Sequence, residues 1–232
     1  CFLNLALIFD LYCDTYIKQK GLVMALVLTP QQHAKHTVFS HEFCSEDSSY
    51  EFEWVTKDHP DRAGLQSFIA TTFYKTYGAD IHHFSDILVG CKDERGQWLA
   101  ALGFSVLEKK KAFLESYLDL PLEMEIAAHL QENVLRSHII EVGNLAAIHP
   151  GAGRTLIINM TRYLHEQGYK WVAFTATRNL LNSFKRLGIK LVQLAEADPK
   201  RLPDAGKNWG SYYDTKPQVM FGDIASGYAK LA

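Results

Sequence analysis

The alternation of strand-like and helix-like patterns in the second half of the chain constrains the fold most strongly. Residues 137–142 form a β-branched run typical of a strand, and residues 171–175 are continuously apolar, as in a strand buried on both faces. Between them, residues 154–167 carry apolar side chains at helical spacing and end at Gly168, a common residue after a helix. A further helix and strand are predicted at Arg178–Leu187 and Lys190–Leu194. This order predicts an α/β fold with a mixed central sheet flanked by helices.

The first half of the chain supplies further elements of the same kind. Apolar residues at helical spacing predict a helix over Asp61–Tyr77, closed by Gly78. Strands are predicted at Glu51–Thr56, Ile87–Lys92 and Trp98–Leu107, the last two joined by a hairpin turn. Polar residues without periodicity precede these elements. We therefore expect residues 1–49 to be an N-terminal extension and flexible arm, and residues 50–232 to form one domain.

The charge balance and the cysteine and histidine patterns argue against several classes of protein. Of 232 residues, 24 are Lys or Arg and 26 are Asp or Glu, so the chain lacks the basic excess of a nucleic-acid-binding protein. The four cysteines include no CxxC pair, and we interpret them as reduced thiols. The ten histidines include no HExxH, so no metal site is predicted. The adjacent His82 and His83 are interpreted as surface residues.

No apolar run in the sequence is long enough to cross a bilayer as a helix, which takes about 20 residues. The stretch Phe2–Tyr12 is short, is interrupted by Asn4 and Asp10, and lacks the basic start and small-residue cleavage site of a secretory signal. Met24 opens a more usual start, and we expect the preceding residues to be an upstream reading-frame extension. These features predict a cytoplasmic protein; secretion would follow only if the chain acts directly on other cells.

The junction between the predicted strand at 137–142 and the predicted helix at 154–167 is the best candidate for a binding site. Glycines between a strand and a helix let the backbone approach a ligand, and the first N–H groups of the helix attract an anion. The residues predicted to bind an anionic group such as a pyrophosphate are Gly151, Ala152, Gly153, Arg154 and Thr155. The alternative is that Gly151 and Gly153 make a tight turn without a ligand.

Two polar residues next to this junction are candidates for catalysis. Glu141 ends the predicted strand, where a carboxylate can act as general base for an attacking amine or hydroxyl. Asn144 can donate its side-chain amide to a developing oxyanion. The alternative for Glu141 is an ordinary ion pair or a solvated position at the end of a strand.

The element order, closing with Asn182-Ser183-Phe184-Lys185-Arg186-Leu187-Gly188-Ile189, resembles the GNAT-type N-acetyltransferase fold. It is also similar to the acyl-homoserine-lactone synthases. The resemblance implies that the loop holds the pyrophosphate of an acyl-coenzyme A, and that strands over 139–145 and 171–175 grip the pantetheine arm. On the last helix it implies substrate contacts at Arg178, Asn182 and Ser183.

Two positions depart from the acetyltransferase pattern. Ile148 stands where Gln or Arg is expected, and Phe184 stands where a Tyr often serves as general acid. Both changes favour a long acyl chain, or a thioester on an acyl carrier protein, over ordinary acetyl-coenzyme A. Lys109–Lys111 is interpreted as a solvated loop. The alternative is a landing patch for an acidic carrier protein, helped by Lys185, Arg186 and Lys190.

A second resemblance covers nearly everything from Tyr50 to Leu231. Four segments in the right order are similar to the thermostable hemolysin family of the δ-VPH type; they are Tyr77–Ile81, Phe113–Asp119, Glu141–Ala146 and Trp209–Asp214. The resemblance implies an association with lysis of blood cells that survives heating. Within the last segment, Tyr212 is a candidate wall of a substrate pocket, the alternative being that it packs the C-terminal segment onto the core.

Three hypotheses for the function follow. In the first, the chain transfers an acyl group from a small-molecule or carrier-bound thioester to an amine. In the second, it is a toxin that damages membranes directly and without enzymatic activity, the one case in which membrane contact is expected. In the third, it binds a ligand without catalysis. The first two are reconciled if the acylated product is the lytic agent, because heat resistance would then belong to a small molecule.

Overall fold

The structure of this protein is a computed structural model that describes residues 50–231. The extension and arm expected at residues 1–49, with the start at Met24, lie outside the described residues. The strands are β1 (Glu51–Val55), β2 (Ile87–Lys92), β3 (Trp98–Val106), β4 (Ile139–Ala147), β5 (Trp171–Ala176), β6 (Leu191–Glu196) and β7 (Gln218–Asp223). The α-helices are α1 (Arg62–Tyr77), α2 (Leu122–Leu130), α3 (Pro150–Glu166), α4 (Arg178–Arg186) and α5 (Ile224–Leu231). Short 3-10 helices include η1 (Phe113–Tyr117) and η2 (Arg136–His138).

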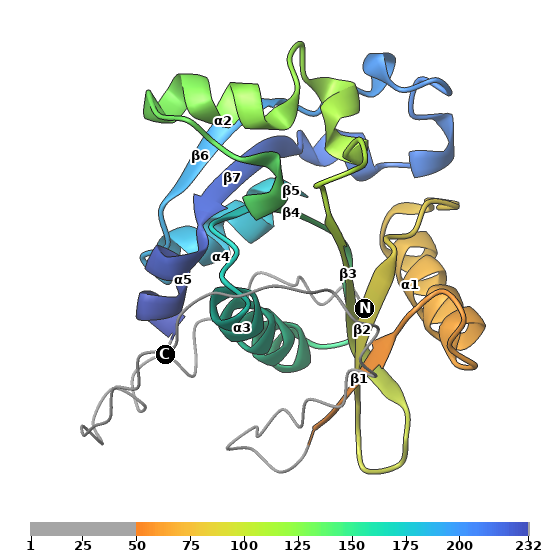
Figure 1. The fold of residues 1–232 in the computed structure, drawn as a ribbon. Helices are drawn as coiled ribbons and strands as arrows, with labels where there is room; N and C mark the ends of the chain where they lie inside the picture. The colour runs from red at the N-terminus through yellow and green to blue at the C-terminus, as the bar shows by residue number, and fades with distance from the viewer. Residues whose placement is uncertain (1–49, 232) are drawn as a thin grey trace, which may run out of the picture.

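The seven strands form one sheet in the order β1-β2-β3-β4-β5-β7-β6. All neighbouring strands are antiparallel except β4 and β5, which run parallel and are connected by α3. The sheet is therefore mixed, as predicted, and helices flank it (Figure 1). The expected hairpin between β2 and β3 is also confirmed.

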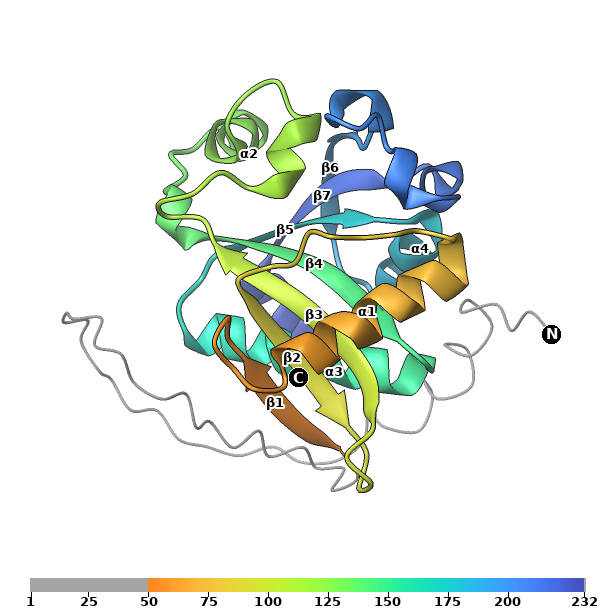
Figure 2. The same cartoon turned by 90° about the vertical axis from the view of Figure 1, so that its right-hand side faces the viewer.

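Helices cover both faces of the sheet, and the cores on the two faces are distinct. On one face, here called the α1 face, α1 packs over β2 to β4, and η1 and α2 pack over β4, β5 and β7. On the other, the α3 face, α3 and α5 pack over β2 to β5, with α4 over β5 and β7. Alternate residues of β4 serve the two sides, since Ile139 is buried with η1 and α2, and Ile140 with α3. Figures 1 and 2 show α1 and α3 on opposite sides of the sheet.

The connection between β4 and α3 differs from the prediction. The strand continues past Gly143 and Asn144 to Ala147, and α3 begins at Pro150, so the predicted strand end at residue 142 and the predicted helix start at residue 154 are both wrong. A proline fits the first turn of a helix because its missing N–H has no partner to lose there. His149 precedes it as the N-cap and accepts the N–H of Ala152 on its Nδ1 at 3.3 Å.

The ends of the other elements lie close to the predicted ones. Helix α1 ends at Gly78, whose φ of 67° is the left-handed conformation that glycine adopts without strain. Residues 113–133 resolve into η1 and α2. Among the described residues, no helix combines the length and apolar character needed to cross a membrane.

Candidate functional site

The parallel strands β4 and β5 separate in the middle of the sheet. Their pairing runs from Ile139 opposite Trp171 to Val142 opposite Phe174 and stops there. Beyond this point β4 continues alongside β3, and β5 continues alongside β7. Figure 2 shows the two strands diverging. The facing edges of Gly143–Ala147 and of the last two residues of β5 thus carry backbone groups that are not used in pairing these strands to each other.

A β-bulge lies on β4 where the strands begin to separate. Gly103 of β3 pairs with Gly143, and Ala101 pairs with Ala146, so two residues of β4 oppose one residue of β3. One of the two is Asn144, whose φ of 52° is left-handed, a conformation that Asn adopts more readily than most residues. A bulge bends its strand and redirects side chains, which explains why the strand turns away from β5 here.

The side chain of Asn144 is engaged by the segment between α1 and β2. Its Oδ1 accepts hydrogen bonds from the backbone N–H of Ser85 at 2.9 Å and from the Ser85 hydroxyl at 3.2 Å. Its Nδ2 donates to the carbonyl oxygen of His83 at 3.0 Å. The residue predicted as an oxyanion donor therefore fixes a loop over the α1 face of the bulge.

Two further residues hold this loop in place. The guanidinium of Arg62, in the first turn of α1, donates to the carbonyl oxygens of Ser85 at 2.6 Å and Asp86 at 3.0 Å. Gly103 leaves room for the loop, because a Cβ there would lie 2.7 Å from the Cβ of Ser85 and 2.9 Å from Oδ1 of Asn144. Neither Arg62 nor Gly103 was predicted as a site residue. A glycine within a strand was the one sequence feature that could have indicated that a loop packs closely against β3.

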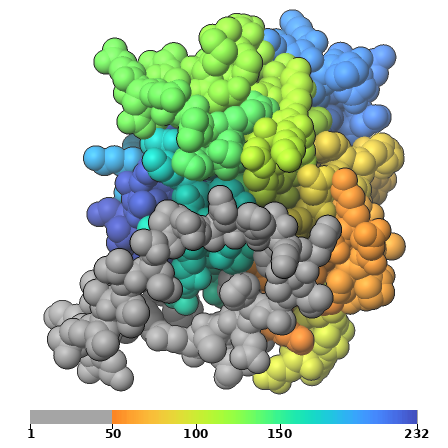
Figure 3. All heavy atoms as spheres, in the orientation of Figure 1, coloured from red at the N-terminus to blue at the C-terminus, as the bar shows by residue number. Residues whose placement is uncertain are grey.

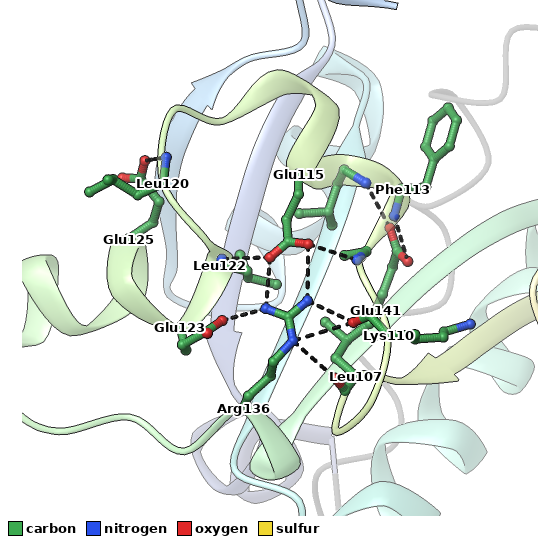
Figure 4. A network of polar contacts seen from close by, with 12 residues as sticks. Leu107, Lys110, Phe113, Glu115, Leu120, Leu122, Glu123, Glu125, Arg136 and Glu141 are labelled. Carbon is green, nitrogen blue, oxygen red and sulfur yellow. Dashed lines mark hydrogen bonds and ion pairs between the residues drawn. The ribbon is translucent and has the colours of Figure 1, made fainter.

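Glu141 lies beneath η1 on the same face of β4. It is 8% exposed, and its carboxylate accepts the backbone N–H groups of Phe113 at 3.1 Å and Leu114 at 2.9 Å, one on each oxygen (Figure 4). Burial raises the pKa of Glu141, and the two backbone N–H groups and Lys110 oppose this effect. Glu141, which was predicted as a general base, therefore holds η1 against the α1 face of β4.

A buried ion pair anchors the same segment from its other side. Arg136 of η2 binds Glu115 of η1 through two nitrogens, at 2.7 Å and 2.9 Å, and also contacts Glu123 (Figure 4). Its guanidinium donates to the carbonyl oxygens of Leu107 at 3.0 Å and Lys110 at 2.7 Å. Residues 107–138 are therefore held at both ends by one arginine, and the position of η1 depends on it.

The segment 107–138 also packs against the residues between β6 and β7. Phe113 lies 6.2 Å from Trp209 between ring centroids, and the hydroxyls of Tyr117 and Tyr213 are 2.7 Å apart. Figure 3 shows these two parts of the chain, green and blue, in contact at the top of the molecule. Tyr212 is 8% exposed and its ring packs 5.2 Å from that of Tyr77. These contacts match the alternative in which Tyr212 packs the C-terminal segment onto the core.

The five residues predicted to bind phosphates form the first turns of α3. Gly153 is buried, and a Cβ there would lie 3.1 Å from the Cβ of Ala147, so this glycine lets the helix pack closely on β4. Arg154 lies in a groove with Ser183 and Phe184 of α4, and its Nε is buried without a hydrogen-bond partner in residues 50–231. The remaining members, Gly151, Ala152 and Thr155, lie within one turn of it.

The residues predicted on the last helix lie on α4, next to this groove. Arg178 and Asn182 are exposed, whereas Ser183 is buried and donates its hydroxyl to the carbonyl oxygen of Asn179 at 3.1 Å. Phe184 packs on Phe174 of β5, with ring centroids 5.5 Å apart. The predicted site residues thus divide between the two faces of the sheet, with Glu141 and Asn144 on the α1 face and the α3 and α4 residues on the other.

One group of potential metal ligands occurs within residues 50–231. It consists of Glu53, His59 and Asp61, whose ligand atoms lie within 4.8 Å of one another. The ammonium of Lys92 contacts both carboxylates and lies 3.0 Å from the Asp61 oxygen. The Lys92 ammonium thus supplies the positive charge that the two carboxylates attract, and the group is a partly exposed ion-pair cluster at the β1–β2 edge.

Comparisons with known structures identify the fold. A structure described as the AHL synthase LasI has a TM-score of 0.52 and 10% identity, covering 76% of this chain and 91% of that chain. A CoA-dependent acyl-homoserine lactone synthase, BjaI, with SAM and isopentyl-CoA, has a TM-score of 0.51 and 11% identity, over 79% and 88%. FeeM, an N-acyl amino acid synthase from uncultured soil microbes, has a TM-score of 0.50 and 13% identity, over 75% and 90%. These likenesses show the acyltransferase-type fold predicted from the sequence.

Sequence comparison identifies the family. A search of curated proteins finds no significant match. The family model described as thermostable hemolysin matches residues 55–228, which include every described strand except part of β1, and all of the site residues predicted from the sequence. On this evidence the chain belongs to the thermostable hemolysin family.

Proposed function

We propose that this protein transfers an acyl group from a thioester to an amine. The separation of β4 from β5 is the observation that carries the proposal, because it leaves backbone donors and acceptors of Gly143–Ala147 unpaired with β5 inside the sheet. An extended molecule with amide groups can pair with such an edge as an added strand would. The pantetheine arm of a coenzyme A or acyl-carrier-protein thioester has this form.

The two faces of the sheet suit the two substrates. On the α3 face, Arg154 offers a cation with an unpartnered buried Nε next to the first turn of α3, and we assign the donor phosphate to Gly151–Thr155. Ser183 lines the same groove, and Arg178 and Asn182 are exposed elsewhere on α4. The amine then approaches the thioester from the α1 face, across the bulge at Asn144.

The structural neighbours support this proposal through the chemistry in their names. Acyl-homoserine lactone synthases and an N-acyl amino acid synthase share the fold, and the BjaI structure contains isopentyl-CoA. Their identities to this chain, 10–13%, leave the acyl length, the amine and the choice between coenzyme A and a carrier protein to experiment.

Within this proposal, Glu141 and Asn144 fix the walls of the acceptor side. Each uses its polar atoms to hold a segment, η1 in one case and residues 83–85 in the other. The direct roles predicted for them, general base and oxyanion donor, remain predictions, since each requires the side chain to exchange a present partner for substrate.

The family's association with lysis is compatible with this chemistry. We propose that an acylated amine made by the enzyme is amphipathic and disrupts membranes, so that the folded chain need not insert. Solvent extracts of producing cultures should then lyse blood cells after protease treatment. Lytic activity that stays with the protein and is lost to protease would instead favour a directly acting toxin.

The decisive experiment incubates the purified protein with octanoyl-coenzyme A and a mixture of amines. Mass spectrometry should detect free coenzyme A and an N-octanoyl product in equal amounts. Arg154→Ala should raise the KM for the donor, and Arg162→Ala, on the same helix, serves as the matched control. Absence of amide product with coenzyme A and carrier-protein donors alike would refute the proposal.

A further inference from the structure

His83 lies over the point where β4 and β5 separate. Its carbonyl oxygen accepts the amide of Asn144 at the bulge, at 3.0 Å. Its ring stacks on Phe113, with centroids 4.7 Å apart and planes 23° from parallel. Phe113 is in turn fixed by Glu141, two residues before Gly143 on β4. Backbone and ring are thus both tied to the segment of β4 that forms the candidate site.

The imidazole of His83 is held in place and remains chemically available. Neither ring nitrogen has a hydrogen-bond partner among residues 50–231, and the residue is exposed. By contrast, the carboxylate of Glu141 and the amide of Asn144 are already engaged by backbone groups. His83 is therefore the ionisable group at this site with a free proton-accepting atom.

The surroundings of His83 favour its neutral form, which is the form that accepts a proton. Loss of solvent on the covered face and the charge of Lys110 lower the pKa of His83, and Asp86 acts in the opposite direction. Asp86 is itself paired with Lys110 and, at 3.0 Å, with Lys57, which weakens its attraction for an imidazolium. A neutral imidazole near pH 7 is suited to general-base catalysis.

The neighbouring histidine lacks these features. His82 is 72% exposed at its side chain, and its Nε2 lies 3.3 Å from a carboxylate oxygen of Asp80. Within residues 50–231, no aromatic ring stacks on His82 as Phe113 stacks on His83. The two adjacent histidines therefore form a natural pair of test and control.

We infer that His83 is the catalytic base that removes a proton from the acceptor amine as the amine attacks the thioester. This inference rests on the proposed acyl transfer. The amine nitrogen forms a bond to the carbonyl carbon, the carbon–sulfur bond breaks, and its electron pair leaves with sulfur. His83 takes the proton from nitrogen and returns it to solvent or to the thiolate, so the products are one amide and one thiol.

The test measures amide formation from octanoyl-coenzyme A across pH for the wild type, His83→Gln and His82→Gln. Removing a general base lowers turnover by about 10²–10⁴-fold, and we expect this loss for His83→Gln with little change in donor KM. His82→Gln should stay within about twofold of the wild type. The wild-type rate should rise with pH through a midpoint below 6.5, and the His83→Gln variant should not show this rise.

Chemical rescue separates a base from a residue that only positions Phe113. Added imidazole should restore amide formation to His83→Ala, whereas it cannot repair a displaced ring. If the wild type is active and His83→Gln keeps its rate and pH profile, the assignment of His83 fails while the acyl transfer stands. If His83→Ala is inactive, folded and not rescued, His83 is not the base. If the wild type forms no amide, both proposals fail.

Discussion

Replacing Arg136 with alanine should destabilise the protein and displace η1. The guanidinium binds both oxygens of Glu115 and also donates to the carbonyl oxygens of Leu107 and Lys110. Glu115 is 6% exposed, so the substitution leaves a buried carboxylate without its counter-ion. Breaking such a pair costs about 3–5 kcal/mol, and we expect about 3 kcal/mol because the Arg136 side chain is 21% exposed.

The assay is urea unfolding of the full chain, monitored by tryptophan fluorescence. Arg201→Ala is the matched control, because Arg201 also donates to carbonyl oxygens of this segment, those of Ser116 and Leu118, but its acidic partner Asp119 is 85% exposed at its side chain. Its substitution should cost about 1 kcal/mol. A cost below about 1 kcal/mol for Arg136→Ala would show that residues 107–138 are held in some other way.

The pH dependence provides an independent check on the same pair. Burial alone would raise the pKa of Glu115, but Arg136 and the backbone N–H groups of Leu122 and Ala112 outweigh it and hold the pKa below its ordinary value of 4.5. The pair therefore contributes stability above pH 4.5 that is lost as the pH falls through the lower folded-state value. Stability of the wild type should fall over this window, and Arg136→Ala should show a smaller fall.

Three further predictions address the site and the core. Gly103→Ala should lower the free energy of unfolding by about 1–3 kcal/mol and lower activity, because the new Cβ would collide with Ser85 and Asn144. Unfolding and turnover assays check this prediction, and unchanged values would show that the loop adapts. Glu141→Gln should lower turnover about 10²–10⁴-fold if Glu141, rather than His83, is the base, and a folded variant with full turnover would remove it from the chemistry. Burial raises the pKa of Cys91 to about 11, so peptide mapping after alkylation at neutral pH should find this thiol unmodified in the native protein and modified in urea.

The fold class could be predicted because local patterns along the chain agree with the final layers. The continuous apolar run of β5 is buried between helices on both faces, and α1 ends at the glycine that closes its pattern. Both signals depend on the residues of one element and its immediate neighbours. Both signals can therefore be read from the sequence without knowing which strands pair.

The course of β4 could not be predicted from the same kind of signal. Gly143 and Asn144 favour turns, and the sequence gives no sign that β3 pairs with the residues on both sides of them. Pairing with β3 accommodates Asn144 in a bulge, and the strand continues to Ala147. The start of α3 was predictable in principle, since Pro150 is a good first helical residue, but the glycines after it suggested a loop.

The functional groups of β4 illustrate a wider limit of prediction from sequence. A carboxylate and an amide near a glycine-rich junction suggested catalysis, yet the fold uses both to hold backbone segments that are 27 and 59 residues away in the chain. Substituting either residue will displace Phe113 or His83 as well as remove its own polar group. Activity loss alone therefore cannot distinguish a base from an anchor at these positions. A change in the pH profile can, because an anchor alters how often the site is correctly formed, whereas a base sets the pH at which the formed site can accept a proton.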